Sequence, residues 1–175
     1  GGSPLNPQAV AQATALADEL TRRGHDVATY VAYQFAEPLI ADVVEKARAD
    51  GVERLVGLPV YPLCGPSTTV AALADTRRAV DALGWEVPVA EIGGWHRHPL
   101  YLELRADALR RTIAEAGLDL ASPDVTLVFS VHGTPMKYIE EGSRYVEYAE
   151  EFCAALAEAV GAPRYRIGYQ NHTNR

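Results

Sequence analysis

The chain has 175 residues, of which 48% are hydrophobic and 22% are charged, and this composition suits one medium-sized domain or parts of two. The net charge of -7 has the wrong sign for a protein whose main partner is a phosphate backbone, which argues against nucleic-acid binding. No apolar run approaches the roughly 20 residues that span a bilayer, and the distant Cys64 and Cys153 form no disulfide or metal-binding pattern. We therefore expect a cytoplasmic protein without a membrane span. The sequence leaves open whether it forms a dimer.

The first half of the chain alternates between helical and strand-like patterns. Apolar residues at helical spacing predict helices over 7–23 and 38–49, the first ending at Gly24. Runs of β-branched and aromatic residues predict strands over 26–33 and 52–60. This alternation predicts right-handed βαβ units with parallel strands.

The second half continues the alternation, and its last helix carries four acidic residues that we expect to form a solvated face. The pattern as a whole predicts an α/β fold, a parallel sheet with helices on both faces. The expected helices cover 70–83, 101–116 and 145–160, and the expected strands cover 87–92, 125–131 and 165–169.

The most informative segment is 125–142, in which a strand ends at a histidine. Residues 125–131 form a run of apolar and β-branched residues interrupted only by Ser130, which predicts a central parallel strand buried on both faces. His132 and Gly133 follow at the carboxyl end of that strand, where α/β sheets bind ligands. His132 is thus a candidate catalytic base or metal ligand, and a local hydrogen-bonding role in the turn is the alternative.

Two further segments carry hydroxyl or imidazole groups. Ser67, Thr68 and Thr69 stand where the third predicted helix starts, so they indicate either an anion site or ordinary helix capping, and capping is favoured. His96 and His98 have the i, i+2 spacing of a metal pair. A packing or turn role is at least as good an interpretation, because no carboxylate lies beside them to complete a site.

Four segments resemble motifs of the ferrochelatases, the enzymes that insert ferrous iron into a porphyrin, and they follow the same order. FSVHGTPMKYIEEGSRY at 129–145 is similar to the family's FSAHGLP motif and its GDPY element, and it is the most specific match. The other three segments are GGSPL at 1–5, LPVYPLCGPSTT at 58–69 and YRIGYQNHTNR at 165–175. Because GGSPL is similar to a loop of the family, the two opening glycines are interpreted as part of a natural loop and not as a tag remnant.

The resemblance implies a chelatase-like fold of flavodoxin-like or Rossmann-like lobes. Residues 1–64 would be the remainder of the first lobe and 65–175 most of the second. The family's first strand and its C-terminal part, with the glutamate that faces the catalytic histidine, have no counterpart here. At 142–145 GSRY replaces GDPY, and Gln34 and Glu37 stand where the family often has an arginine and a histidine.

The resemblance also assigns roles to individual residues. His132 would be the catalytic residue, as metal ligand or pyrrole proton acceptor, because a neutral imidazole can accept a proton and binds iron as a borderline ligand. The hydroxyls would meet porphyrin carboxylates, while the tyrosines would pack on the macrocycle or, alternatively, fill the rim of the core. The expected substrate-binding residues are Ser3, Tyr61, Ser67, Thr68, Thr69 and Tyr145.

The function that this resemblance favours is ferrochelatase activity on protoporphyrin or coproporphyrin in haem biosynthesis. Ferrous iron would be a substrate, and no further cofactor is expected. One alternative is a related chelatase that loads cobalt or nickel into another tetrapyrrole. The other is a lobe that binds a tetrapyrrole without turning it over, or a periplasmic-type binding domain.

Overall fold

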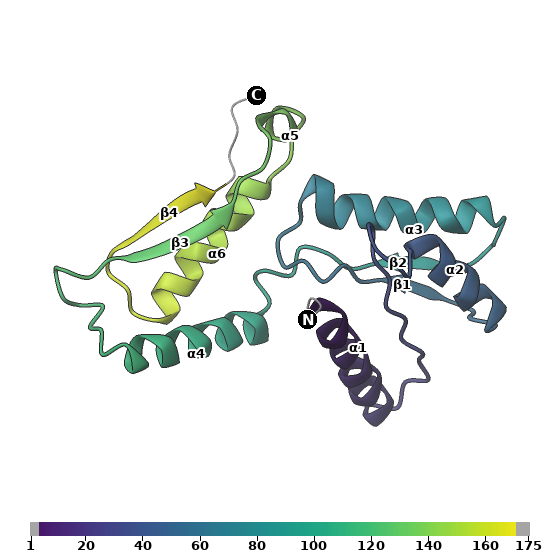
Figure 1. The fold of residues 1–175 in the computed structure, drawn as a ribbon, viewed down its shortest axis with the longest axis horizontal. Helices are drawn as coiled ribbons and strands as arrows, with labels where there is room; N and C mark the ends of the chain where they lie inside the picture. Colours follow the sequence, from purple (N-terminus) through teal and green to yellow (C-terminus); the bar gives the residue numbers. More distant parts are fainter. Residues whose placement is uncertain (1–3, 171–175) are drawn as a thin grey trace. The chain divides into compact units, whose positions relative to one another are not determined.

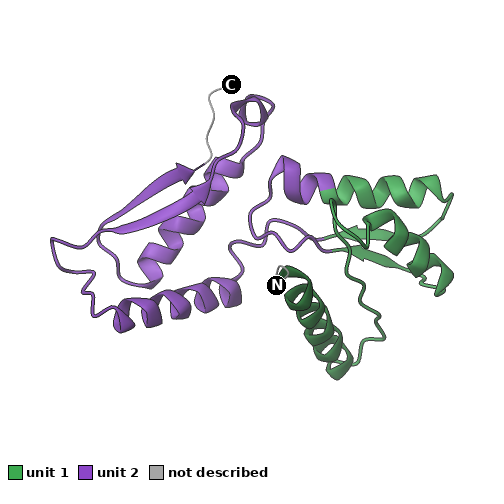
Figure 2. Ribbon diagram, in the orientation of Figure 1, with its two compact units in different colours: residues 1–57, 72–91 green, residues 58–71, 92–175 purple. Residues whose placement is uncertain are grey.

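The computed structural model describes residues 4–170, which form an α/β fold in two compact units (Figures 1 and 2). Unit 1 comprises 1–57 and 72–91, and unit 2 comprises 58–71 and 92–175. The lobe boundary between residues 64 and 65 stays a prediction. Among the described helices, none is both long and apolar enough for a membrane crossing.

Unit 1 contains a parallel pair of short strands with helices on it. In β1 and β2, Leu55 lies opposite Val89 and Gly57 opposite Glu91. The first helix ends where the sequence predicts, because Gly24 takes a left-handed φ of 87° that other residues rarely adopt. Its elements are α1 (Leu5–Arg22), α2 (Ile40–Ala49), β1 (Leu55–Gly57), α3 (Ala71–Ala82) and β2 (Val89–Glu91).

The core of unit 1 lies between α2 and α3. Val44 of α2 and Ala79 and Val80 of α3 are buried together. Trp85 and Val89, which follow α3 in the chain, pack against this cluster and connect it to the strands. Burial of these apolar side chains is the main force that holds a short helix against two three-residue strands.

Unit 2 pairs its two strands in parallel over six residues, from Leu127 opposite Tyr165 to His132 opposite Gln170. In Figure 1, α6 lies along this pair and α4 runs beside α6. The buried hydrophobic residues of the unit lie on these two helices, among them Ala106 of α4 and Cys153 of α6. Its elements are the π-turn (Pro66–Val70), α4 (Pro99–Glu115), β3 (Leu127–His132), α5 (Met136–Glu140), α6 (Tyr145–Ala159) and β4 (Tyr165–Gln170).

The predicted α/β class with parallel strands is confirmed, but two details are wrong. Within the described residues, 26–33 forms no strand and makes one isolated bridge, between Tyr33 and Leu39. Strand propensity depends on a neighbouring ladder, which this run lacks. The strand over 125–131 is not buried on both faces either, because half-buried and exposed residues alternate along β3 and Val128 is 61% exposed.

Candidate functional site

His132 is the last residue of β3 and lies at the carboxyl end of the parallel pair, as the sequence predicts. The alternation along β3 places it on the exposed face, with Val128 and Ser130. The backbone is held there by the ladder, because the N–H of Gly133 donates to the carbonyl oxygen of Gln170 at 2.7 Å. The strand therefore presents the His132 imidazole from a fixed backbone position.

Tyr145, the first residue of α6, contacts the same strand end. Its hydroxyl donates a hydrogen bond to the carbonyl oxygen of His132 at 3.1 Å. Burial raises the pKa of Tyr145 above its ordinary value, so the phenol remains a protonated donor at neutral pH. The start of α6 is thus joined to the residue that carries the candidate catalytic imidazole.

The Tyr145 ring also packs against the turn that contains the predicted hydroxyl residues. A Cβ added at Gly65 would lie 2.9 Å from Thr68 Oγ1 and 3.3 Å from Tyr145 Cδ2, so there is no room for a side chain. Thr68 donates its hydroxyl to the Gly65 carbonyl oxygen at 3.3 Å. Tyr145 therefore joins two segments that lie far apart in the sequence.

The three hydroxyl residues do not cap a helix, contrary to the favoured interpretation. The helical turn begins at Pro66, with Gly65 as its N-cap and no side-chain capping hydrogen bond. The helix starts earlier than predicted, so the hydroxyls belong to its first turn. Ser67 is exposed, whereas Thr69 is 1% exposed and its Oγ1 has no hydrogen-bond partner within the described part of the chain.

Of the two remaining predicted residues, Tyr61 is described by the structure and Ser3 is not. Tyr61 is 43% exposed in the segment between β1 and the π-turn. Ser3 lies outside the described residues. Over residues 4–170, no three side chains of the His, Cys, Asp and Glu types are grouped as a metal site would need.

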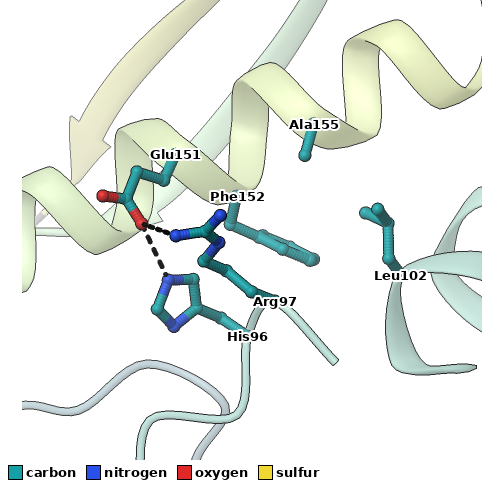
Figure 3. A pocket seen from close by; sticks show the side chains of 6 residues that line it. All are labelled: His96, Arg97, Leu102, Glu151, Phe152 and Ala155. Atoms are coloured by element: carbon teal, nitrogen blue, oxygen red, sulfur yellow. Dashed lines mark hydrogen bonds and ion pairs between the residues drawn. The ribbon is translucent and has the colours of Figure 1, made fainter. Parts of the chain in front are cut away.

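A second cluster, which the sequence did not predict, forms around His96 on the loop before α4 (Figure 3). His96 is 4% exposed, and its Nε2 lies 3.3 Å from Oε2 of Glu151 on α6. The expectation that no carboxylate lies beside His96 is therefore wrong. The packing interpretation holds for His96, because this side chain is buried. His98, in contrast, is exposed and is the N-cap residue of α4.

This pair borders a cavity of about 480 Å³ between the loop, α4 and α6. Polar groups form one wall, and Figure 3 shows Arg97 reaching past Phe152 towards the carboxylate of Glu151. The lining residues are His96, Arg97, Leu102, Glu151, Phe152 and Ala155. Three of the four acids on α6 are exposed as expected, while the carboxylate of Glu151 is only 39% exposed because it faces the loop.

A sequence signal for this contact exists in α6. Tyr145, Tyr148 and Phe152 are spaced so that they share one face of a helix. An aromatic face on a helix with acidic residues indicates packing against another segment. Which segment it meets could not be predicted, because the loop at 95–98 is about 50 residues away in sequence.

Comparisons with known proteins point to one family. A family model described as Ferrochelatase matches residues 1–175. A ferrochelatase from Synechococcus sp. (strain JA-3-3Ab) is 37% identical over 175 residues, which are 98% of this chain and 50% of that protein. Ferrochelatases from Picosynechococcus sp. (strain ATCC 27264 / PCC 7002 / PR-6) and Geobacter sp. (strain M21) are 32% and 29% identical and cover 98% and 100% of this chain, and 45% and 53% of their own lengths.

The chain thus spans about half the length of the curated relatives that it matches. The match runs through both strand pairs and through the end of β3 where Tyr145 and His132 meet. A histidine at the carboxyl end of a parallel strand is where an α/β enzyme would keep a reactive group. With the family model matching from the first residue to the last, this chain belongs to the ferrochelatase family.

Proposed function

We propose that the protein to which this chain belongs is a ferrochelatase that inserts ferrous iron into protoporphyrin or coproporphyrin. The observation that carries the proposal is the family match over the whole chain, with His132 exposed at the carboxyl end of β3. Residues 1–64 would belong to a first lobe and 65–175 to a second. Iron and porphyrin are the substrates.

The reaction sets specific demands on a side chain at this site. Two pyrrole N–H protons leave the porphyrin, and the two nitrogens they vacate bind the incoming Fe²⁺, so two protons are released per metal inserted. A neutral imidazole can accept one of these protons or hold the metal during transfer. His132 is the catalytic residue in this proposal, and the ladder through Gly133 keeps its backbone in place.

The walls of the porphyrin site are proposed from the segments around His132. Tyr145 would offer its ring to the macrocycle near the strand end, and Tyr61 offers a second exposed ring. Aromatic walls suit a flat, largely apolar ligand. Porphyrin carboxylates would bind at the hydroxyl groups of Ser3, Ser67 and Thr68. Thr69, in contrast, is only 1% exposed and would support the turn from inside.

The proposal is tested with His132→Ala in the protein at its natural length. Zinc insertion into a porphyrin is followed by fluorescence, and porphyrin affinity is measured separately by quenching. Loss of a general base or metal ligand should lower kcat by about 100-fold or more, with affinity changed only a few-fold. His98→Ala is the matched control, because His98 is an exposed imidazole at the start of α4.

The outcomes separate the candidate functions. Unchanged turnover in His132→Ala would remove the catalytic assignment. Tight porphyrin binding by the wild-type protein with no insertion of any divalent metal would favour a binding lobe. Preference for cobalt or nickel and for a more carboxylate-rich tetrapyrrole would favour a related chelatase.

A further inference from the structure

One face of α6 is built from aromatic side chains. Tyr145, Tyr148 and Phe152 follow one another at helical spacing. Tyr145 reaches the carbonyl oxygen of His132, as described above. The position of this face therefore decides whether the Tyr145 hydroxyl meets the end of β3.

The C-terminal part of this face packs on a stack of rings. The rings of Phe152 and Tyr101 stack with their centroids 5.5 Å apart, and Tyr101 meets Trp95 edge-on at 4.9 Å. The indole N–H of Trp95 donates to the carbonyl oxygen of Pro59 at 3.4 Å. Aromatic pairs of this kind stabilise a contact beyond the area they bury.

The N-terminal part of the face depends on His96. The rings of His96 and Tyr148 lie 5.0 Å apart, and Nε2 of His96 is 3.3 Å from Oε2 of Glu151, one turn further along α6. A neutral imidazole with its proton on Nε2 would donate to that carboxylate. His96 is buried, and its Nδ1 has no partner among the described residues, so the contacts that account for the ring's placement are those to α6.

Two arginines also reach Glu151, but more weakly. One nitrogen each of Arg97 and Arg144 lies 4.0 Å from its carboxylate, at the limit of an ion pair, and both side chains are more than half exposed. Exposed ion pairs contribute little because water and salt screen them. The buried imidazole is therefore the contact that fixes Glu151.

A cavity lies beside the contact between His96 and Glu151. The space of about 480 Å³ is bordered by His96 and by Glu151, Phe152 and Ala155 of α6. No side chain of the described residues fills this space, so the rings of the stack and His96 are the contacts that hold this face of α6 on the loop. Loss of His96 would remove the contacts to Tyr148 and Glu151 at the start of α6.

We propose that His96 is a positioning residue for the site at the end of β3. By holding Glu151 and Tyr148, it fixes the first two turns of α6 and keeps the Tyr145 hydroxyl on the carbonyl oxygen of His132. The geometric part of this proposal stands by itself, whereas its effect on metal insertion rests on the proposed function. His96 touches neither substrate in this scheme and acts only through α6.

The geometric part is measured in the protein at its natural length by the carbonyl ¹³C chemical shift of His132. Tyr145→Phe supplies the reference, because it removes the hydrogen bond to that carbonyl. His96→Ala should move the signal in the same direction, and His96→Gln should restore it because a glutamine amide can donate to Glu151. Arg97→Ala is the matched control and should leave the signal in place, since Arg97 is an exposed neighbour of the same carboxylate.

The catalytic part uses the zinc-insertion assay on the same variants in the natural protein. His96→Ala should lower kcat about tenfold and change the porphyrin KM less than about twofold, because small displacements of a reacting group cost rate more than binding. His96→Gln should recover most of the rate. If His96→Ala fails to fold, Glu151→Ala replaces it, since it removes the contact and keeps the buried ring.

The results of the two experiments support or overturn the positioning role of His96. An unmoved His132 signal in folded His96→Ala or Glu151→Ala overturns the proposal, and so does an equal movement in Arg97→Ala. A fall in rate without any movement of the signal overturns it as well, because His96 would act by another route. A signal that moves in a protein with no insertion activity supports the positioning role and contradicts the ferrochelatase proposal instead.

Discussion

Gly93→Ala tests how tightly the buried threonine of the π-turn is held. A Cβ at Gly93 would lie 2.6 Å from Cγ2 of Thr69, well inside van der Waals contact. Thr69 is 1% exposed and has a short, branched side chain, so it cannot swing away. The alanine methyl therefore has to displace the backbone of the π-turn or of the loop that follows β2.

Two opposing effects set the magnitude. Overpacking of this kind costs about 1–3 kcal/mol of unfolding free energy. Replacing a glycine at an unstrained position gains about 0.4–1 kcal/mol by restricting the unfolded chain. Gly93 does not have a left-handed φ, so the second effect applies and a net loss of about 1–2 kcal/mol is expected.

The assay is urea unfolding followed by circular dichroism. With a slope of about 2 kcal/mol per molar urea, the midpoint should fall by roughly 0.5–1 M. Gly168→Ala in β4 is the matched control, because nothing lies within 4 Å of its added Cβ, and it should be neutral or slightly stabilising. Thr69→Ser removes Cγ2, so in the double variant it should recover about 1 kcal/mol. Equal midpoints for the two alanine variants, or no recovery with Thr69→Ser, would refute the steric argument.

Three further predictions concern unit 2. Tyr145→Phe should lower the unfolding free energy by about 0.5–1.5 kcal/mol in urea titrations, because one hydrogen bond to the end of β3 is lost while the ring remains; no loss would mean that water replaces it fully. Burial raises the pKa of Cys153 to about 11 from 9.0, so its neutral thiol stabilises the fold below pH 9 and this contribution fades as the pH rises to 11. The unfolding free energy should therefore fall less between pH 9 and 11 in Cys153→Ala than in the wild type. Iodoacetamide at pH 8 should label the half-buried Cys64 before the buried Cys153, and labelling of Cys153 before Cys64 would contradict the burial argument. Arg110→Gln should lower the unfolding free energy by about 0.5 kcal/mol in the same titrations, because Arg110 donates a hydrogen bond of 2.7 Å to the carbonyl oxygen of Ala159 at the end of α6. An unfolding free energy equal to that of the wild type would contradict this contribution.

The sequence by itself determined the order of most elements and their type. Helix ends at Gly24 and at 49–51 follow from local backbone preferences, and the strand before His132 follows from its apolar run. These features depend on residues close together in the chain, so they can be read without knowing the partners. The same holds for the position of His132 at the end of a parallel strand, since parallel strands follow from the alternation with helices.

Only the tertiary structure decided which elements meet. The run over 26–33 has strand-like residues but lacks a ladder among the described residues, and β3 exposes one face to solvent. His96 and Glu151 lie 55 residues apart, and their contact comes from the packing of a loop on α6. Hydrogen-bond ladders and packed rings join residues that are distant in the chain. A local sequence pattern therefore indicates that one face of a helix or strand packs against another segment, but it does not indicate which segment that is.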